Sequence, residues 1–127
     1  MKFSLDTLGG QHVIRSYTAG EVRVDDQVLR GSFLLSADAL VRDWPPQTLE
    51  QLGAEHLEQA VELDPELIVL GVGSRQRFPA TAVVAPLYRR QIGLEVMTTD
   101  AACRTYNILR GEDRRVVAAI LMLEHRS

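Results

Sequence analysis

The stretch GLEVMTTDAACRTYNILRGEDRRVVAAI (93–120) decides the fold, because it contains a strand, a helix and a second strand in succession. Its first part, LEVM (94–97), predicts a short strand, and VVAAILML (116–123) predicts an apolar strand near the centre of a sheet. Upstream, LIVLGVG (67–73) is a nearly continuous aliphatic run of the kind that forms strands covered on both faces. Strands that alternate with helices indicate a mainly parallel or mixed sheet.

The segment between two of these strands predicts a helix over 98–110. Thr98, Thr99 or Asp100 can cap its start, and Gly111 is its expected stop. This helix would cover one face of the sheet.

Two further helices are expected. AEHLEQAVEL (54–63) places apolar residues near one helical face and stops before an Asp-Pro pair. Another helix is expected within 79–92, with Gly93 just beyond it; Pro86 either kinks this helix or begins a shorter one. WPPQTLEQLG (44–53) is expected to be a rigid connection with room for one short strand, because its two prolines oppose a helix.

The N-terminal third predicts a small antiparallel β region. HVIRSYT (12–18) and EVRVDD (21–26) alternate apolar and polar residues, and VLRGSFLLS (28–36) follows after a turn. The predicted fold class is therefore α/β: a mixed central sheet flanked by helices, with this extra β region beside it.

Length and composition predict one ordinary globular domain over residues 1–127, since 46% of the residues are hydrophobic and 24% are charged. No apolar run approaches the roughly 20 residues that span a bilayer, so direct membrane insertion is not expected. The first ten residues match neither a signal peptide nor a transit peptide. A single cysteine allows no internal disulfide and leaves a structural zinc site short of thiolates, which favours a soluble protein of the reducing cytoplasm.

Charge is distributed unevenly along the chain. Residues 1–66 carry five basic and twelve acidic side chains, whereas residues 67–127 carry nine arginines and five acidic side chains. The simpler interpretation is that the two halves attract each other within one fold; the alternative is a basic face for an anionic partner. A nucleic-acid partner is not expected, because no nucleic-acid motif accompanies the small basic excess.

The end of the aliphatic run carries the strongest candidate for ligand binding. Open α/β sheets place ligands at the carboxyl ends of their strands, and glycines there let backbone N–H groups approach an anion. Five residues are candidates for holding a small anion or an acidic side chain: Gly71, Gly73, Ser74, Arg75 and Arg77. A nucleotide-binding fingerprint is incomplete, because Gln76 stands where its third glycine belongs. The simpler interpretation is a tight turn with solvated arginines.

Cys103 has two interpretations. The start of its helix and Arg104 would lower the pKa of a thiol, as a nucleophile requires. None of the three histidines is placed to act as its base, so we expect a small buried residue and no catalytic set. No spacing of His, Asp or Cys proposes a metal site, and no cofactor is expected.

The long segment from G-L-E-V-M-T-T-D to R-R-V-V-A-A-I-L closely resembles the C-terminal signature of a family of small single-domain proteins. This family includes NADH dehydrogenase assembly factor 3 and the adipogenesis-associated Mth-type domain proteins. The resemblance extends backward through L-G-V-G (70–73) to Trp44, and more faintly through the early strands. Eight residues occupy matching positions in the family motif: Gly71, Gly73, Glu95, Arg104, Thr105, Tyr106, Asn107 and Arg115.

The resemblance implies a three-layer α/β fold, no established enzymatic activity and no known cofactor. The mitochondrial relatives help to assemble a respiratory complex through protein contacts. Our first hypothesis is therefore a non-enzymatic binding or assembly module, whose protein partner meets the carboxyl end of the sheet and the helix that carries Thr99, Arg104 and Asn107. The alternatives are a small-anion or small-ligand protein or enzyme that uses the Gly71–Arg77 turn, and a homodimer.

Overall fold

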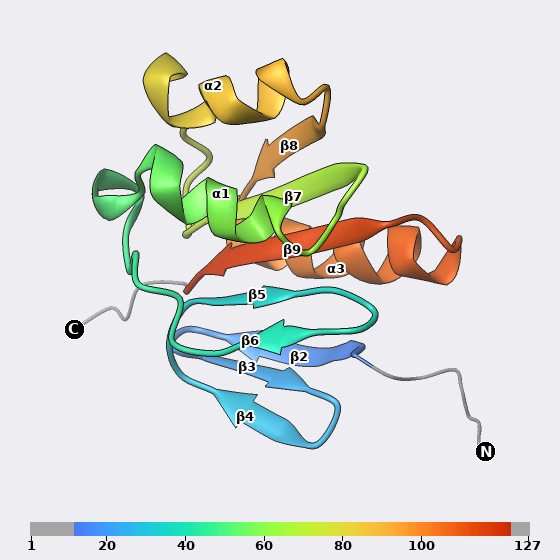
Figure 1. The fold of residues 1–127 in the computed structure, drawn as a ribbon. Coiled ribbons are helices and arrows are strands. Elements are labelled where there is room, and N and C mark those ends of the chain that lie inside the picture. Colours follow the sequence, from blue (N-terminus) through green and yellow to red (C-terminus); the bar gives the residue numbers. More distant parts are fainter. Residues whose placement is uncertain (1–11, 123–127) are drawn as a thin grey trace.

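The computed structural model describes residues 12–122, which form two sheets and three α-helices (Figure 1). The larger sheet has five strands in the order β6-β5-β9-β7-β8. Their bounds are Phe33–Leu35 for β5, Leu40–Val41 for β6, Leu67–Val72 for β7, Gly93–Met97 for β8 and Val116–Leu121 for β9. β7 is parallel to β8 and β9, whereas β5 is antiparallel to β9 and β6. The predicted mixed sheet is confirmed, and the aliphatic run 67–73 lies near its centre.

The helices cover both faces of this sheet. α1 (Ala54–Val61) and α2 (Thr81–Arg89) pack on one face, and α3 (Thr99–Gly111) packs on the other (Figure 1). The chain crosses from β7 through α2 to β8, and then back over β7 through α3 to β9. Because these two crossovers run in opposite directions and both favour the right-handed form, their helices fall on opposite faces.

A second sheet of three antiparallel strands packs beside α3. It contains β2 (Ile14–Thr18), β3 (Glu21–Val24) and β4 (Gln27–Leu29). Its buried side chains join those of α3 in the core on that face of the large sheet. The predicted antiparallel β region of the N-terminal third is therefore confirmed.

The side chains of β9 contribute to a hydrophobic core on each face of the large sheet. Val117, Ala119 and Leu121 face α1 and α2, whereas the alternate residues Val116, Ala118 and Ile120 face α3. Every residue of β9 is buried. This explains why the sequence shows an unbroken apolar run here and no polar alternation.

Two predicted elements differ from the structure. The run 28–36 is not one strand: it breaks at 30–32, so that β4 joins the small sheet and β5 joins the large one. The connection 44–53 contains no strand; it forms the 3-10 helix η1 (Leu49–Gln51). A short 3-10 helix is compatible with the prolines because it begins after both of them.

Helix ends also differ from expectation. Gln91 and Asp113 adopt the left-handed backbone conformation after α2 and α3, with φ of 58° and 61°. Gly93 already belongs to β8, and Gly111 is the last residue of α3. Pro86 lies inside α2, so the alternative of a shorter helix that begins at Pro86 is wrong. Within residues 12–122, no helix has the length and apolar character needed to cross a bilayer.

The end of β7 and the start of α3 approach each other very closely. A Cβ atom built on Gly71 would lie 3.0 Å from the Cα of Thr99 and 3.1 Å from the Cβ of Ala102. Thr99 is fully buried at this junction, and its amide donates to the Gly73 carbonyl at 2.9 Å. In return the Gly73 amide donates to the Thr99 hydroxyl at 2.9 Å, and that hydroxyl donates to the Leu121 carbonyl of β9. One threonine therefore joins α3 to both central strands.

Replacing Gly71 with alanine should destabilise the protein by about 1–3 kcal/mol, because the added methyl group meets backbone and helix atoms that cannot move independently. Gly111→Ala is the matched control. A Cβ at Gly111 meets nothing within 4 Å, so this change in a helix should be neutral or stabilise by up to about 1 kcal/mol. Urea unfolding measures both, and equal effects would show that the contact at Gly71 carries no strain.

Thr99→Val should lower the free energy of unfolding by about 2 kcal/mol or more, because it leaves the buried Gly73 N–H and Leu121 carbonyl without the hydroxyl. Thr99→Ser keeps the hydroxyl and loses one methyl group, which costs about 1 kcal/mol. A valine variant as stable as the serine variant in the same unfolding assay would contradict this role for the hydroxyl.

Candidate functional site

The loop 73–80, which connects β7 to α2, is bordered by three neighbouring hollows. The first, about 190 Å³, lies between this loop, residues 47–50 and the carboxyl ends of β7 and β9. The second, about 390 Å³, lies between residues 49–52 and the start of α2. The third, also about 390 Å³, lies between α2 and β8. Arg77 borders the first two hollows and Phe78 the last two, so the loop forms a shared rim.

An ion pair separates the first two hollows. Arg77 Nη1 lies 2.6 Å from Glu50 Oε2, and both side chains border both hollows. The hydrogen bond from Arg77 holds the pKa of Glu50 below its ordinary value. The exposed side-chain fractions are 40% for Arg77 and 66% for Glu50, so the pair is open to solvent and easily exchanged.

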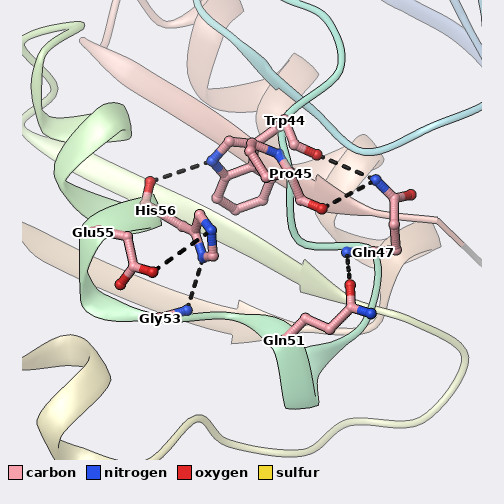
Figure 2. A network of polar contacts seen from close by, with 7 residues as sticks. All are labelled: Trp44, Pro45, Gln47, Gln51, Gly53, Glu55 and His56. Carbon is pink, nitrogen blue, oxygen red and sulfur yellow. Dashed lines mark hydrogen bonds and ion pairs between the residues drawn. The ribbon is translucent and has the colours of Figure 1, made fainter.

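The wall formed by residues 47–50 is fixed by the polar network in Figure 2. The buried Trp44 donates its indole N–H to the His56 carbonyl at 3.3 Å, and the His56 ring accepts the Gly53 amide at 2.9 Å, which ties this wall to the start of α1. The side-chain Nε2 of Gln47 donates to the Trp44 carbonyl at 3.3 Å, and the backbone N–H of Gln47 donates to Gln51 Oε1 at 2.8 Å. His56 is half-buried.

The rim of the third hollow carries two exposed aromatic side chains. Phe78 and Tyr88 are exposed by 72% and 67%, and both border this hollow together with Leu94 and Val96 of β8. β8 pairs only with β7 among the described strands, so it forms an edge of the large sheet. Aromatic side chains with this much exposure beside a strand edge are typical of protein-binding surfaces.

The predicted site residues separate into two groups. Gly71, Gly73 and Thr99 meet in the junction of β7 and α3, while Ser74 and Arg75 are exposed on the loop and Arg77 pairs with Glu50. The Gly73 amide, which the anion hypothesis offers to a ligand, is held by Thr99. The junction therefore uses these glycines for close packing.

Arg104 and Asn107 lie on the side of α3 that contacts the small sheet. Arg104 Nη1 donates to the Tyr17 hydroxyl at 2.9 Å and lies 3.7 Å from Asp100. Asn107 donates to the Ile14 carbonyl at 2.8 Å and accepts the Ile14 amide at 3.0 Å, in the manner of a neighbouring strand. The side-chain amide of Asn107 therefore serves to hold β2 against α3.

Cys103 is fully buried, as predicted for a small core residue. Burial, reinforced by the negative charge of Asp100, raises the pKa of its thiol from 9.0 to about 12, although Arg104 acts in the opposite direction. The nucleophile interpretation is therefore contradicted: Arg104 lowers this pKa, but burial outweighs it. Burial likewise raises the pKa of Tyr106, whose hydroxyl donates to the His12 carbonyl at 2.8 Å.

A hollow of about 270 Å³ lies at the opposite end of the sheet, near the amino ends of β7 and β9. Arg110, Arg114 and Arg115 border it, but so do three aspartates: Asp38, Asp64 and Asp113. Arg114 pairs with Glu66 at 3.2 Å, and Arg115 donates to the Asp64 carbonyl at the same distance. These charges offset one another. Among residues 12–122, no group of three or more His, Cys, Asp or Glu side chains is arranged to hold a metal ion.

Sequence reasoning missed Glu50, Phe78 and Tyr88. Helical periodicity does not identify Tyr88 as exposed, because Tyr88 lies four positions after the buried Val84 and therefore near the same helix face. An exposed phenylalanine in a loop and an ion pair between residues 27 positions apart likewise leave no signal in the sequence.

The raised pKa of Cys103 should make the protein less stable in alkali. The unfolded thiol ionises near pH 9, whereas the folded thiol stays neutral to about 12, so stability is full below pH 9 and is lost as the pH rises between these values. Tyr106 adds to the loss in the same direction. Cys103→Ala should reduce the pH dependence of the free energy of unfolding by up to about 1.4 kcal/mol per pH unit. Urea unfolding from pH 8 to 11 measures it; an unchanged slope would show that the thiol is accessible.

Comparisons with known proteins are consistent with this fold. The chain is 30% identical over 111 residues to NADH dehydrogenase [ubiquinone] 1 alpha subcomplex assembly factor 3 of Danio rerio, covering 86% of this chain and 63% of the relative. It is 44% identical to a protein of Xanthomonas campestris with a solution structure (TM-score 0.80), over 91% of this chain and 89% of the other. A Mth938-like domain of Bordetella pertussis is 29% identical (TM-score 0.82), over 98% of this chain and 94% of the other.

The chain spans between 54% and 63% of the length of the curated relatives it matches. The family model for proteins of unknown function DUF498/DUF598 matches residues 14–121, which contain both sheets and all three α-helices described above. The resemblance inferred from the sequence is therefore confirmed, and the chain belongs to the DUF498/DUF598 family.

Proposed function

We propose that this protein is a binding module of the assembly-factor type, and that it holds a segment of another protein in the groove between α2 and β8. The observation that carries the proposal is the pair of aromatic side chains, Phe78 and Tyr88, exposed by 72% and 67% at the rim of this groove. The similarity to complex I assembly factor 3 supports a role in protein contacts.

The surface chemistry supports a protein partner over a small anion. An anion site at the Gly71–Arg77 turn would need free backbone N–H groups, but the Gly73 amide donates to Thr99 and Arg77 binds Glu50. The groove instead combines two exposed aromatic side chains with apolar and polar groups in similar measure, and aromatic residues are enriched in protein interfaces. Phe78 also borders the hollow near η1, so a longer segment would extend toward Arg77.

Site-specific photo-crosslinking in the cells that produce the protein tests this proposal. A p-benzoylphenylalanine residue in place of Tyr88 should crosslink to a defined protein partner, identified by mass spectrometry. The same residue in place of Arg30, exposed on the small sheet, should not. Equal capture of the same proteins at both positions would contradict the proposal.

Phe78→Ser should reduce the yield of the Tyr88-position crosslink at least about tenfold, because aromatic anchors in interfaces commonly contribute 2 kcal/mol or more. Ile108→Ser is the matched control, since Ile108 is also exposed, by 61%, but lies on α3. A yield that falls equally in both variants would show that the groove is not the binding surface.

A further inference from the structure

We propose that the partner segment binds as an additional β-strand along β8, and that it alternates apolar and basic side chains. This inference rests on the proposed function, because it names the kind of segment that the groove between α2 and β8 takes. Three observations carry it: the free edge of β8, the polar side chain that covers part of that edge, and the different chemistry of the two faces of β8.

The backbone of β8 presents hydrogen-bonding groups outward at Leu94 and Val96. The Gly93 amide donates to the Glu66 carbonyl at 3.1 Å, and farther along the Thr99 amide donates to the Gly73 carbonyl at 2.9 Å. The backbone N–H and C=O groups of the odd-numbered residues of β8 therefore point toward β7. Because successive residues of a strand point their backbone groups to opposite sides, Leu94 and Val96 face away from the sheet. An extended segment can pair with these groups.

The side chain of Gln76 already bonds to one of these outward-pointing backbone groups. Its side-chain Nε2 donates to the Val96 carbonyl at 3.0 Å, and Gln76 is exposed and borders the groove. This contact imitates the N–H group of a neighbouring strand. A long open edge invites unwanted pairing, and a single exposed glutamine covers it without closing it permanently. The incoming backbone would take the place of this amide.

The two faces of β8 specify the side chains of the segment. Leu94 and Val96 point to the α2 face, where they pack with the core beneath α2 and border the groove. Because side chains alternate along a strand, that of Glu95 starts from the other face; Glu95 is exposed and also borders the groove. It takes part in none of the ion pairs found among residues 12–122. Directly opposed side chains on neighbouring strands lie within about 5.5 Å, so a lysine or arginine opposite Glu95 would be favoured. Its neighbours would place apolar groups beside Phe78 and Tyr88.

The same charge opposes a second copy of this chain as the occupant. Antiparallel pairing of two β8 strands over their full length would set Leu94 against Val96 of the other copy. Glu95 would then lie directly opposite Glu95 of that copy, and like charges in this position are destabilising. The edge is therefore better suited to a different, basic segment.

Titration of the ¹⁵N-labelled protein with synthetic peptides tests the inference. The probe is an acetylated and amidated heptapeptide of alternating valine and lysine. It should slow hydrogen exchange at the amides of Leu94 and Val96 and bind about tenfold or more tightly than the peptide with glutamate in place of lysine. A peptide with the same composition, but with all valines before all lysines, should not protect these two amides.

Glu95→Lys should reverse the preference, so that the glutamate peptide binds more tightly than the lysine peptide. Glu112→Lys is the matched control: it makes the same charge change at an exposed site at the end of α3 and should leave the preference unchanged. Gln76→Ala should strengthen binding of the lysine peptide, because the Val96 carbonyl is then uncovered.

Three results would overturn the inference. Chemical-shift changes at Phe78 and Tyr88 without protection of Leu94 and Val96 would show that the groove binds without strand pairing, and the proposed function would stand. If Glu112→Lys reversed the preference as much as Glu95→Lys, overall charge and not the position of Glu95 would determine which peptide binds more tightly. Absence of any peptide effect on the groove would overturn strand addition; the crosslink at the Tyr88 position would then decide separately whether the proposed function fails as well.

Discussion

The contact between the end of β7 and the start of α3 is the constraint on which the rest of the structure depends. Gly71 leaves no room for a side chain, and the Thr99 hydroxyl bonds to backbone groups of both β7 and β9. Moving α3 outward by even the size of a methyl group would break these buried bonds, which is costly where no water replaces them. The position of α3 then sets where the small sheet can pack, because Asn107 and Tyr106 hold the start of that sheet through its backbone.

At the carboxyl end of the sheet, this packing fixes the end of β7 and leaves the loop that follows it exposed. The backbone of Gly73 is used within the fold, and the loop that follows turns outward and presents Arg77 and Phe78 along adjoining hollows. A rigid strand end that supports an exposed loop suits recognition, since the loop is presented on a fixed scaffold. The wall across the hollow is fixed in the same way, because the buried Trp44 anchors it to α1 (Figure 2).

Most of the fold could be predicted from local pattern. The aliphatic runs at 67–73 and 116–123, the helical spacing at 54–63 and the capping residues near Thr98 identify elements whose type depends on nearby residues. The errors occurred where a longer contact decides. The break within 28–36 depends on two different sheets competing for neighbouring residues. The predicted site residues at the carboxyl end of the sheet stay a prediction, and the exposed aromatic residues Phe78 and Tyr88 were not identified from the sequence.

The sequence by itself determined the α/β class, the family and the burial of Cys103, because these depend on periodicity, on a long shared motif and on the lack of a nearby base. Only the tertiary structure decided that β8 is an edge strand, that Phe78 and Tyr88 stay exposed beside it, and that Glu50 reaches Arg77. The order of strands in a sheet follows from how helices pack across it. Phe78, Tyr88 and Val96 belong to a loop, a helix and a strand in succession, and local patterns do not record how these three segments pack together.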